Sequence, residues 1–209
     1  MIFNARTLAW LVATAALFIA FGAHAQAATA PDALVKTVST DVLESVKADK
    51  SIQSGELKKV IALVDQKVMP YVDFQRMTSS AVGRYWRQAT PEQQKRLQDE
   101  FKLLLVRTYS GALSQVSPEQ TIELKPMRSQ PSDTEVVVRT EIRGKGDPIQ
   151  LDYRLTKAGD SWKIYDVNVM GVWLVENYRN SFAQEIGANG IDGLIGKLAE
   201  RNKTAAAKG

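Results

Sequence analysis

The chain has 209 residues and a net charge of +4 that is spread along the sequence, which argues against a nucleic-acid partner. It contains no cysteine, and its single histidine, His24, precedes the predicted cleavage site of an export signal. Sites built on thiolate or imidazole, for zinc, copper or a nucleophile, are therefore excluded from the mature protein, and we expect no metal and no cofactor.

The N-terminal segment has the three parts of a secretory signal. A short basic start at Arg6 is followed by an apolar run from Leu8 to Phe21 and by the small-residue site Ala23-His24-Ala25. This order predicts a signal peptide over residues 1–25 that is cleaved after Ala25. The apolar run has about 14 residues, whereas a membrane-spanning helix needs roughly 20, so a retained anchor is the weaker alternative. We expect one globular domain over residues 26–201, outside the cytoplasm.

The first part of the mature chain shows helical spacing of its apolar residues. Two amphipathic helices are predicted, over residues 31–49 and from Ser54 to the proline at position 70. The aromatic-rich segment 71–88 predicts a short helix and a turn. Thr90-Pro91-Glu92-Gln93 forms a capping box, which begins a long helix that reaches about Ser114. Its apolar stripe is so wide that we expect this helix to pack on two sides.

The spacing then changes to a two-residue alternation that is typical of β-strands. Four such segments are separated by turn sequences rich in Gly, Asp, Ser and Pro. They are Thr121–Met127, Glu135–Arg143, Pro148–Lys157 and Ser161–Met170. The alternation predicts an antiparallel sheet with one apolar face and one face toward solvent.

Helical spacing returns after the sheet. It predicts a helix from Val172 to about Gly187 and a short last helix over residues 191–200, and the tail 202–209 is predicted to be disordered. The predicted fold is therefore α+β. A twisted four-stranded antiparallel sheet over residues 121–170 carries the helical parts, 31–115 and 172–200, on one face.

A local basic cluster follows the aromatic-rich segment. Arg84 and Arg87 flank Tyr85 in the sequence. One interpretation is an ordinary solvated face. The other is a mouth that contacts lipid phosphates or an acidic docking partner.

Several separated motifs occur in a fixed order along nearly the whole mature chain. They are Pro70–Phe74, Gly83–Gln93, Phe101 and Thr108-Tyr109 in the front half, and Trp162–Val167, Gly171-Val172, Asn177–Arg179 and Gly190–Leu194 in the back half. Together they resemble the MlaC (toluene-tolerance) family of periplasmic phospholipid-binding proteins. Each motif alone would be weak, but their coincidence in order makes the resemblance specific.

The resemblance implies a periplasmic carrier with bound phospholipid as its cargo. Such a carrier shuttles glycerophospholipid between an outer-membrane lipoprotein–porin complex and an inner-membrane ABC transporter complex with a lipid-binding ring, and so maintains outer-membrane lipid asymmetry. The fold it implies, a twisted antiparallel sheet with helices packed against it and acyl chains between them, agrees with the one predicted above. We expect a monomer, because a carrier must leave each partner.

The apolar phase of the predicted elements then suggests a cavity lining. The nine expected lipid-binding residues are Phe74, Leu105, Tyr109, Val138, Leu151, Tyr153, Val169, Val172 and Trp173. Two alternatives stay open at this point. One is an exported adaptor with a solid core, and the other is a small hydrolase-like enzyme that uses Asp or Tyr. The missing histidine and the absence of a paired-carboxylate motif argue against the enzyme, so no catalytic residue is expected.

Overall fold

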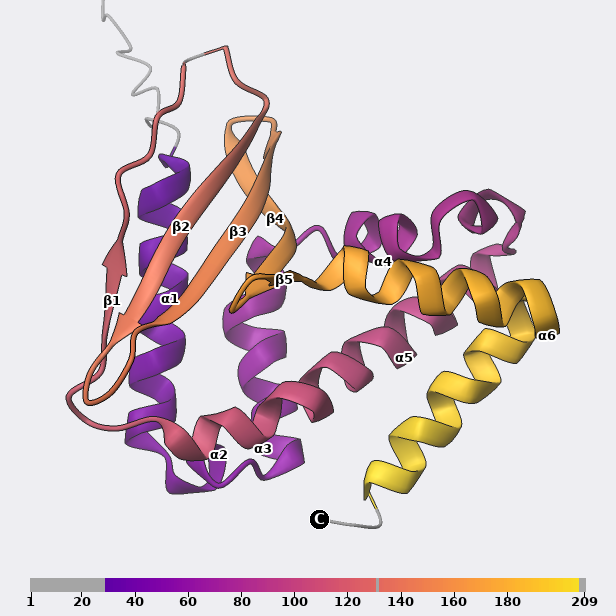
Figure 1. The fold of residues 1–209 in the computed structure, drawn as a ribbon, viewed down its shortest axis with the longest axis horizontal. Coiled ribbons are helices and arrows are strands. Elements are labelled where there is room, and N and C mark those ends of the chain that lie inside the picture. The colour runs from indigo at the N-terminus through magenta and orange to yellow at the C-terminus, as the bar shows by residue number, and fades with distance from the viewer. Residues whose placement is uncertain (1–28, 131, 207–209) are drawn as a thin grey trace, which may run out of the picture.

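The computed structural model describes residues 29–130 and 132–206. The predicted signal peptide and its cleavage site lie outside the described residues. Within the described part of the chain, no helix combines the length and the apolar character that crossing a bilayer requires. Figure 1 shows the arrangement, with a sheet on one side of the molecule and helices around its base and along its flank.

The sheet is an antiparallel meander in which every strand pairs with its neighbour in sequence. Its strands are β1 (Thr121–Leu124), β2 (Glu135–Arg143), β3 (Ile149–Ala158), β4 (Ser161–Val169) and β5 (Val172–Trp173). The α+β class is confirmed, but the sheet has five strands where four were expected. Met170 and Gly171 take positive φ values of 50° and 91° and reverse the chain tightly. The next two residues therefore pair with β4 before the following helix begins, and the expected helix start at Val172 was wrong.

A β-bulge in β4 changes which side chains face the helices. Leu155 pairs with Ile164, whereas the preceding residue of β3, Arg154, pairs with Asp166, so Tyr165 is the extra residue. Across a bulge the two-residue alternation shifts by one position. The apolar face of β4 thus passes from Ile164 to Val167, and Asp166 turns to the opposite face of the sheet.

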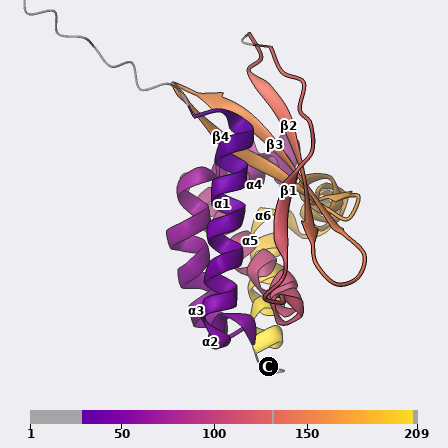
Figure 2. The same cartoon turned by 90° about the vertical axis from the view of Figure 1, so that its left-hand side faces the viewer.

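The helices gather on the apolar face and at the base of the sheet (Figures 1 and 2). In chain order they are α1 (Pro31–Ala48), α2 (Lys50–Gln53), α3 (Leu57–Leu63), the π-helical segment η1 (Val64–Val68), the 3-10 turn η2 (Met69–Tyr71), α4 (Phe74–Val82), the 3-10 segment η3 (Gly83–Gln88), α5 (Pro91–Ser110), the 3-10 segment η4 (Gly111–Gln115) and α6 (Leu174–Ala206). Helix α1 packs on β1 and β2 and contacts η1, so the α3–η1 segment lies beside it.

Helix α5 begins as the sequence predicts. The Thr90 hydroxyl accepts a hydrogen bond from the Gln93 amide at 3.2 Å, and the Gln93 side-chain oxygen accepts one from the Thr90 amide at 3.0 Å. Two amides that have no partner within the helix are thereby satisfied. The helix ends at Ser110 and continues as the 3-10 segment η4.

Helix α6 is bent into two arms at Gly190, which has φ 72° and ψ −179°. The first arm lies along α4 and the second turns back beside α5 (Figure 1). The second arm continues to Ala206, beyond the expected start of a disordered tail at residue 202. Asn202 is buried, and its side-chain amide donates to the backbone oxygen of Glu100 at 3.0 Å and to the Glu100 carboxylate at 2.7 Å.

Three clusters of buried apolar side chains hold these elements together. One joins α4, α5 and α6 around Phe101, whose ring makes edge-to-face contacts with Tyr178 and Phe182. A second joins α1 to the sheet, and a third joins α1, α2 and α3 to α5. The clusters do not merge into one solid core, because two cavities lie between them.

Candidate functional site

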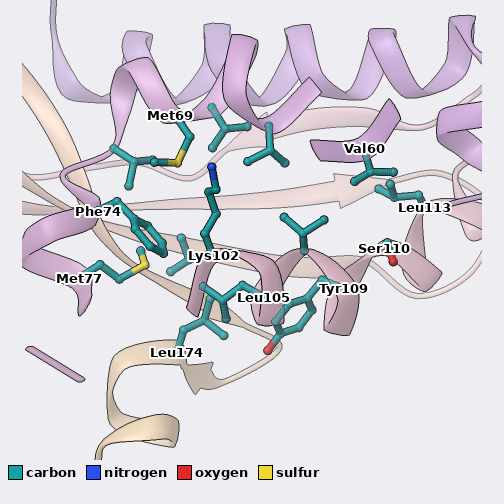
Figure 3. A pocket seen from close by; sticks show the side chains of 15 residues that line it. Val60, Met69, Phe74, Met77, Lys102, Leu105, Tyr109, Ser110, Leu113 and Leu174 are labelled. Atoms are coloured by element: carbon teal, nitrogen blue, oxygen red, sulfur yellow. The ribbon is translucent and has the colours of Figure 1, made fainter. Parts of the chain in front are cut away.

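The first cavity, called here the helical cavity, lies between the α3–η1–η2 segment and α5. Its volume is about 240 Å³. Its lining is almost entirely apolar and is formed by Val60, Val64, Val68, Met69, Val72, Phe74, Met77, Lys102, Leu105, Val106, Tyr109, Ser110, Leu113, Val167 and Leu174. Figure 3 shows side chains that converge on the cavity from these walls and from neighbouring elements, among them Phe74 and Met77 of α4 and Leu174 of α6.

The second cavity, called here the sheet cavity, lies between α1 and the apolar face of the sheet. Its volume is about 260 Å³. Its lining is formed by Val38, Ser39, Val42, Leu43, Val46, Val68, Val72, Leu113, Val116, Ile122, Ile142, Leu151, Tyr153, Ile164 and Val167. Of the described residues that line it, none is charged.

The two cavities share a wall. Val68, Val72, Leu113 and Val167 line both, so a single layer of side chains separates one space from the other. Small-ligand sites in proteins have volumes of roughly 300–1,000 Å³, and the two cavities together fall in that range.

The local backbone conformation and the small side chains of the wall explain why no side chain fills the helical cavity. The helix that begins at Leu57 becomes a π-helix over Val64–Val68, where each turn holds more residues than in an α-helix. This places Val64 and Val68 in the wall of the helical cavity. Valine is short and stiff at χ1, so these side chains do not reach across the space.

One charged residue lies in the lining of the helical cavity. Lys102 extends from α5 across the cavity toward the segment that carries Met69 (Figure 3). Its ammonium pairs with the Asp65 carboxylate of η1 at 2.8 Å. The pair is partly exposed, since the Lys102 side chain is 29% and the Asp65 side chain 46% accessible. It therefore lies where the cavity meets solvent.

The two tyrosines of the cavities are uncharged at neutral pH. Burial raises the pKa of Tyr109, with a smaller contribution from the nearby Tyr178. Burial also raises the pKa of Tyr153, although hydrogen bonds to Ser39 and Thr140 act in the opposite direction. The Tyr153 hydroxyl lies 3.2 Å from the Ser39 hydroxyl and links β3 to α1. Because a raised pKa keeps a phenol protonated, neither tyrosine is prepared to act as a base.

Asp166 is the buried carboxylate whose pKa is raised, first of all by desolvation. It lies on the face of the sheet away from the cavities. One oxygen accepts from the amides of Val167 and Val175 at 2.9 and 3.1 Å, and the other accepts from Arg154 at 3.1 Å. These contacts hold the start of α6 against β4, so the carboxylate has a structural role. The described residues contain no group of three or more acidic or histidine side chains that could hold a metal ion.

Comparison with known proteins identifies the family of this chain. The sequence model described as "MlaC protein" matches residues 36–200. The chain belongs to the MlaC family. The resemblance drawn from the sequence motifs is thereby confirmed.

Related proteins carry names that refer to phospholipid or to toluene tolerance. The chain is similar to the solved structure of a phospholipid-binding protein from Ralstonia solanacearum in complex with a phospholipid, at 49% identity and a TM-score of 0.80, over 84% of this chain and 98% of that one. It is 28% identical to the toluene tolerance protein ttg2D of Pseudomonas putida, over 90% of this chain and 91% of the relative. It is 25% identical to the intermembrane phospholipid transport system binding protein MlaC of Haemophilus influenzae, over 83% of each.

Five of the residues expected to line the cavity of this MlaC-family chain do so. Phe74, Leu105 and Tyr109 line the helical cavity, and Leu151 and Tyr153 line the sheet cavity. The elements that carry them are those whose apolar phase is clearest in the sequence. Their contact with lipid stays a prediction.

The other four expected residues lie outside both linings. Val138 is fully buried in the solid cluster between α1 and the sheet. Val169 follows Val167 on the apolar face, but beyond the end of the cavity. The tight reversal after β4 leaves Val172 49% exposed, and it turns Trp173 to the opposite face, where the Arg154 guanidinium lies 3.9 Å from the ring centroid. None of these four residues lines the helical or the sheet cavity, and their contact with lipid stays a prediction.

The basic cluster lies on η3, away from the cavities of this family member. Arg84 donates to the Tyr85 hydroxyl at 2.9 Å, and both residues border a separate open cleft of about 570 Å³ between α4 and α6. Arg179 of α6 borders the same cleft, whereas Arg87 does not. None of the three η3 residues lines either cavity, so the structure gives no support to the expectation that they form the mouth of the cavity.

Sequence reasoning missed the charged pair at the cavity. Lys102 precedes Leu105 and Tyr109 by three and seven residues, so it shares their face of α5. This spacing was available in the sequence. Its partner Asp65 was not predictable, because the π-helical turn that carries it has no clear sequence signal.

Proposed function

We propose that this chain carries glycerophospholipid, with the acyl chains sheltered in the helical and sheet cavities. The observation that supports this most is the pair of adjacent apolar cavities in a chain that is 49% identical to a protein solved with a bound phospholipid. An apolar lining with few polar groups suits hydrocarbon, because it offers dispersion contacts and competes for no hydrogen bonds.

The energetics of lipid in water explain why a carrier is needed. Two acyl chains contain on the order of 30 methylene groups at about 0.8 kcal/mol each, so exposing both to water costs on the order of 20 kcal/mol. Spontaneous release is therefore negligible, and transfer requires a partner that opens the cavity or offers a continuous apolar path. Opening of the cavities must move apart the valine and leucine side chains that line both of them.

The finer part of the proposal concerns where the lipid comes from and goes. The carrier works in the periplasm and exchanges lipid with an outer-membrane lipoprotein–porin complex and an inner-membrane ABC transporter complex with a lipid-binding ring. It thereby maintains outer-membrane lipid asymmetry. The name of the Haemophilus relative, which refers to an intermembrane phospholipid transport system, supports this route. Arg84 and Tyr85, beside the α4–α6 cleft, and Arg87 on the same segment are the candidate contacts with these partners.

The two other functions considered from the sequence have less support. An adaptor with a solid core does not account for two adjacent apolar cavities. An enzyme needs an activated group at the cavity, whereas both cavity tyrosines are held protonated and Asp166 caps a helix on the other side of the sheet.

A charged side chain in the cavity tests the proposal. We expect Leu105→Glu to lower the amount of co-purifying phospholipid at least about ten-fold, since a carboxylate placed in the apolar lining costs more than the 1.4 kcal/mol that a factor of ten represents. The measurement is organic extraction of the purified protein followed by mass spectrometry. The same change in Leu151 should act likewise in the sheet cavity.

The matched control is Leu103→Glu. Leu103 lies on the same helix and is half-buried, but it lines neither cavity. Its variant should keep wild-type lipid content. Equal lipid in the two glutamate variants and the wild type would argue against the cavities as the lipid site.

A further inference from the structure

The ion pair between Lys102 and Asp65 crosses the edge of the helical cavity. Lys102 belongs to α5 and Asp65 to η1, so the pair connects the two walls of the cavity, and their ammonium and carboxylate lie 2.8 Å apart. Figure 3 shows the lysine side chain running between the apolar side chains to reach the opposite wall. The methylene stem of Lys102 thus belongs to the apolar lining, while its charged end lies at the boundary with solvent.

The Lys102–Asp65 ion pair is easily broken. Ion pairs between partly exposed side chains contribute little to stability, because water solvates both charges when they separate. Among the described residues that line the two cavities, Lys102 is the charged one, so this ion pair offers the charges nearest to a head group at the edge of the helical cavity.

We propose that Lys102 and Asp65 form a head-group site that prefers a zwitterionic phospholipid, in which the phosphate pairs with Lys102 and the head-group ammonium pairs with Asp65. This rests on the proposed function. A phosphoethanolamine head group carries both charges and replaces one protein ion pair with two protein–lipid pairs. A head group with the phosphate charge alone, such as phosphoglycerol, leaves Asp65 without its partner beside an anion.

Competition between two lipids with the same acyl chains measures this preference. The protein is incubated with vesicles of equimolar phosphatidylethanolamine and phosphatidylglycerol and re-isolated, and the bound lipids are quantified by mass spectrometry. Exposed ion pairs are each worth a factor of about two to five, so we expect wild-type protein to retain phosphatidylethanolamine in about that excess. Asp65→Asn should bring the ratio to that of the vesicles, and Asp65→Glu should retain the wild-type preference.

The matched control removes the same charge from the same region without touching the cavity. Lys95 and Asp99 form a highly exposed ion pair on α5 at 2.5 Å, and neither lines a cavity. Asp99→Asn should therefore leave the ratio unchanged. A shift as large as that of Asp65→Asn would show a net-charge effect and overturn the proposal.

The outcomes also separate this inference from the function on which it rests. Wild-type protein that retains about one phospholipid per chain, in the proportion of the vesicles, would overturn the head-group site and leave the carrier function standing. Wild-type protein that retains no phospholipid would overturn both.

Discussion

Asp166 shows how one buried side chain joins the sheet to the helix that follows it. Its side chain is 1% exposed, and both carboxylate oxygens are hydrogen-bonded, with two backbone amides on one oxygen and Arg154 on the other. The amide of Val175 lies in the first turn of α6, where backbone donors have no partner within the helix. Asp166 thereby fixes where α6 leaves the sheet.

The pH dependence of stability tests this role. Because burial raises the pKa of Asp166 above its ordinary value of 3.8, the folded state binds this proton more tightly than the unfolded state. Its contribution to stability is therefore greatest at a pH below 3.8 and decreases as the pH rises through the raised value. The free energy of unfolding of wild type minus that of Asp166→Asn should fall over this window. Urea unfolding at a series of pH values measures it, and a difference that rises with pH would contradict the assignment.

Single residues also show where sequence reasoning about the site succeeds. Leu105 and Tyr109 were predicted because α5 has an unambiguous start at its capping box, which sets the phase of every later residue. Val172 and Trp173 were misplaced because positive φ at Met170 and Gly171 inserts a two-residue strand. A methionine in the sequence does not indicate such a turn, because residues other than glycine rarely adopt positive φ.

Gly190 determines the shape of α6 at the scale of the element. Its φ of 72° and ψ of −179° lie in a region that only glycine adopts readily, and the bend there returns the second arm of α6 to α5. The sequence predicted two helices on either side of this glycine, but not that they form one bent unit extending to Ala206.

A pair of glycine substitutions tests the bend. Gly190→Ala should destabilise the fold by about 1–3 kcal/mol, because alanine is strained in this conformation. Gly187 lies three residues earlier in regular helix with free space around it, so Gly187→Ala should be neutral or stabilising by up to about 1 kcal/mol. Thermal or urea unfolding measures both. Equal effects of the two substitutions would contradict the role of Gly190.

Two other elements show the limit of pattern reasoning. The strand β4 was predicted as a regular alternation, but the extra residue Tyr165 shifts its phase and brings Val167 into both cavities. One helix was expected from Ser54 to Pro70, whereas the structure has α3 over Leu57–Leu63 followed by the π-helical segment η1, which was not predicted. Both irregularities depend on tertiary packing, and both occur where the protein forms its cavities.

At the scale of the whole molecule, the fold keeps three solid clusters apart and leaves apolar space between them. A protein interior usually packs to the density of an organic crystal, and an unfilled apolar volume costs stability. The clusters around Phe101 and between α1 and the sheet are solidly packed, whereas the wall shared by the two cavities consists of Val68, Val72, Leu113 and Val167.

The most direct test of the account is native mass spectrometry of the protein purified without detergent. The account predicts a mass that exceeds that of the chain by one phospholipid and returns to the bare value after delipidation. A chain that carries no lipid under these gentle conditions, and takes none up from vesicles, would contradict it.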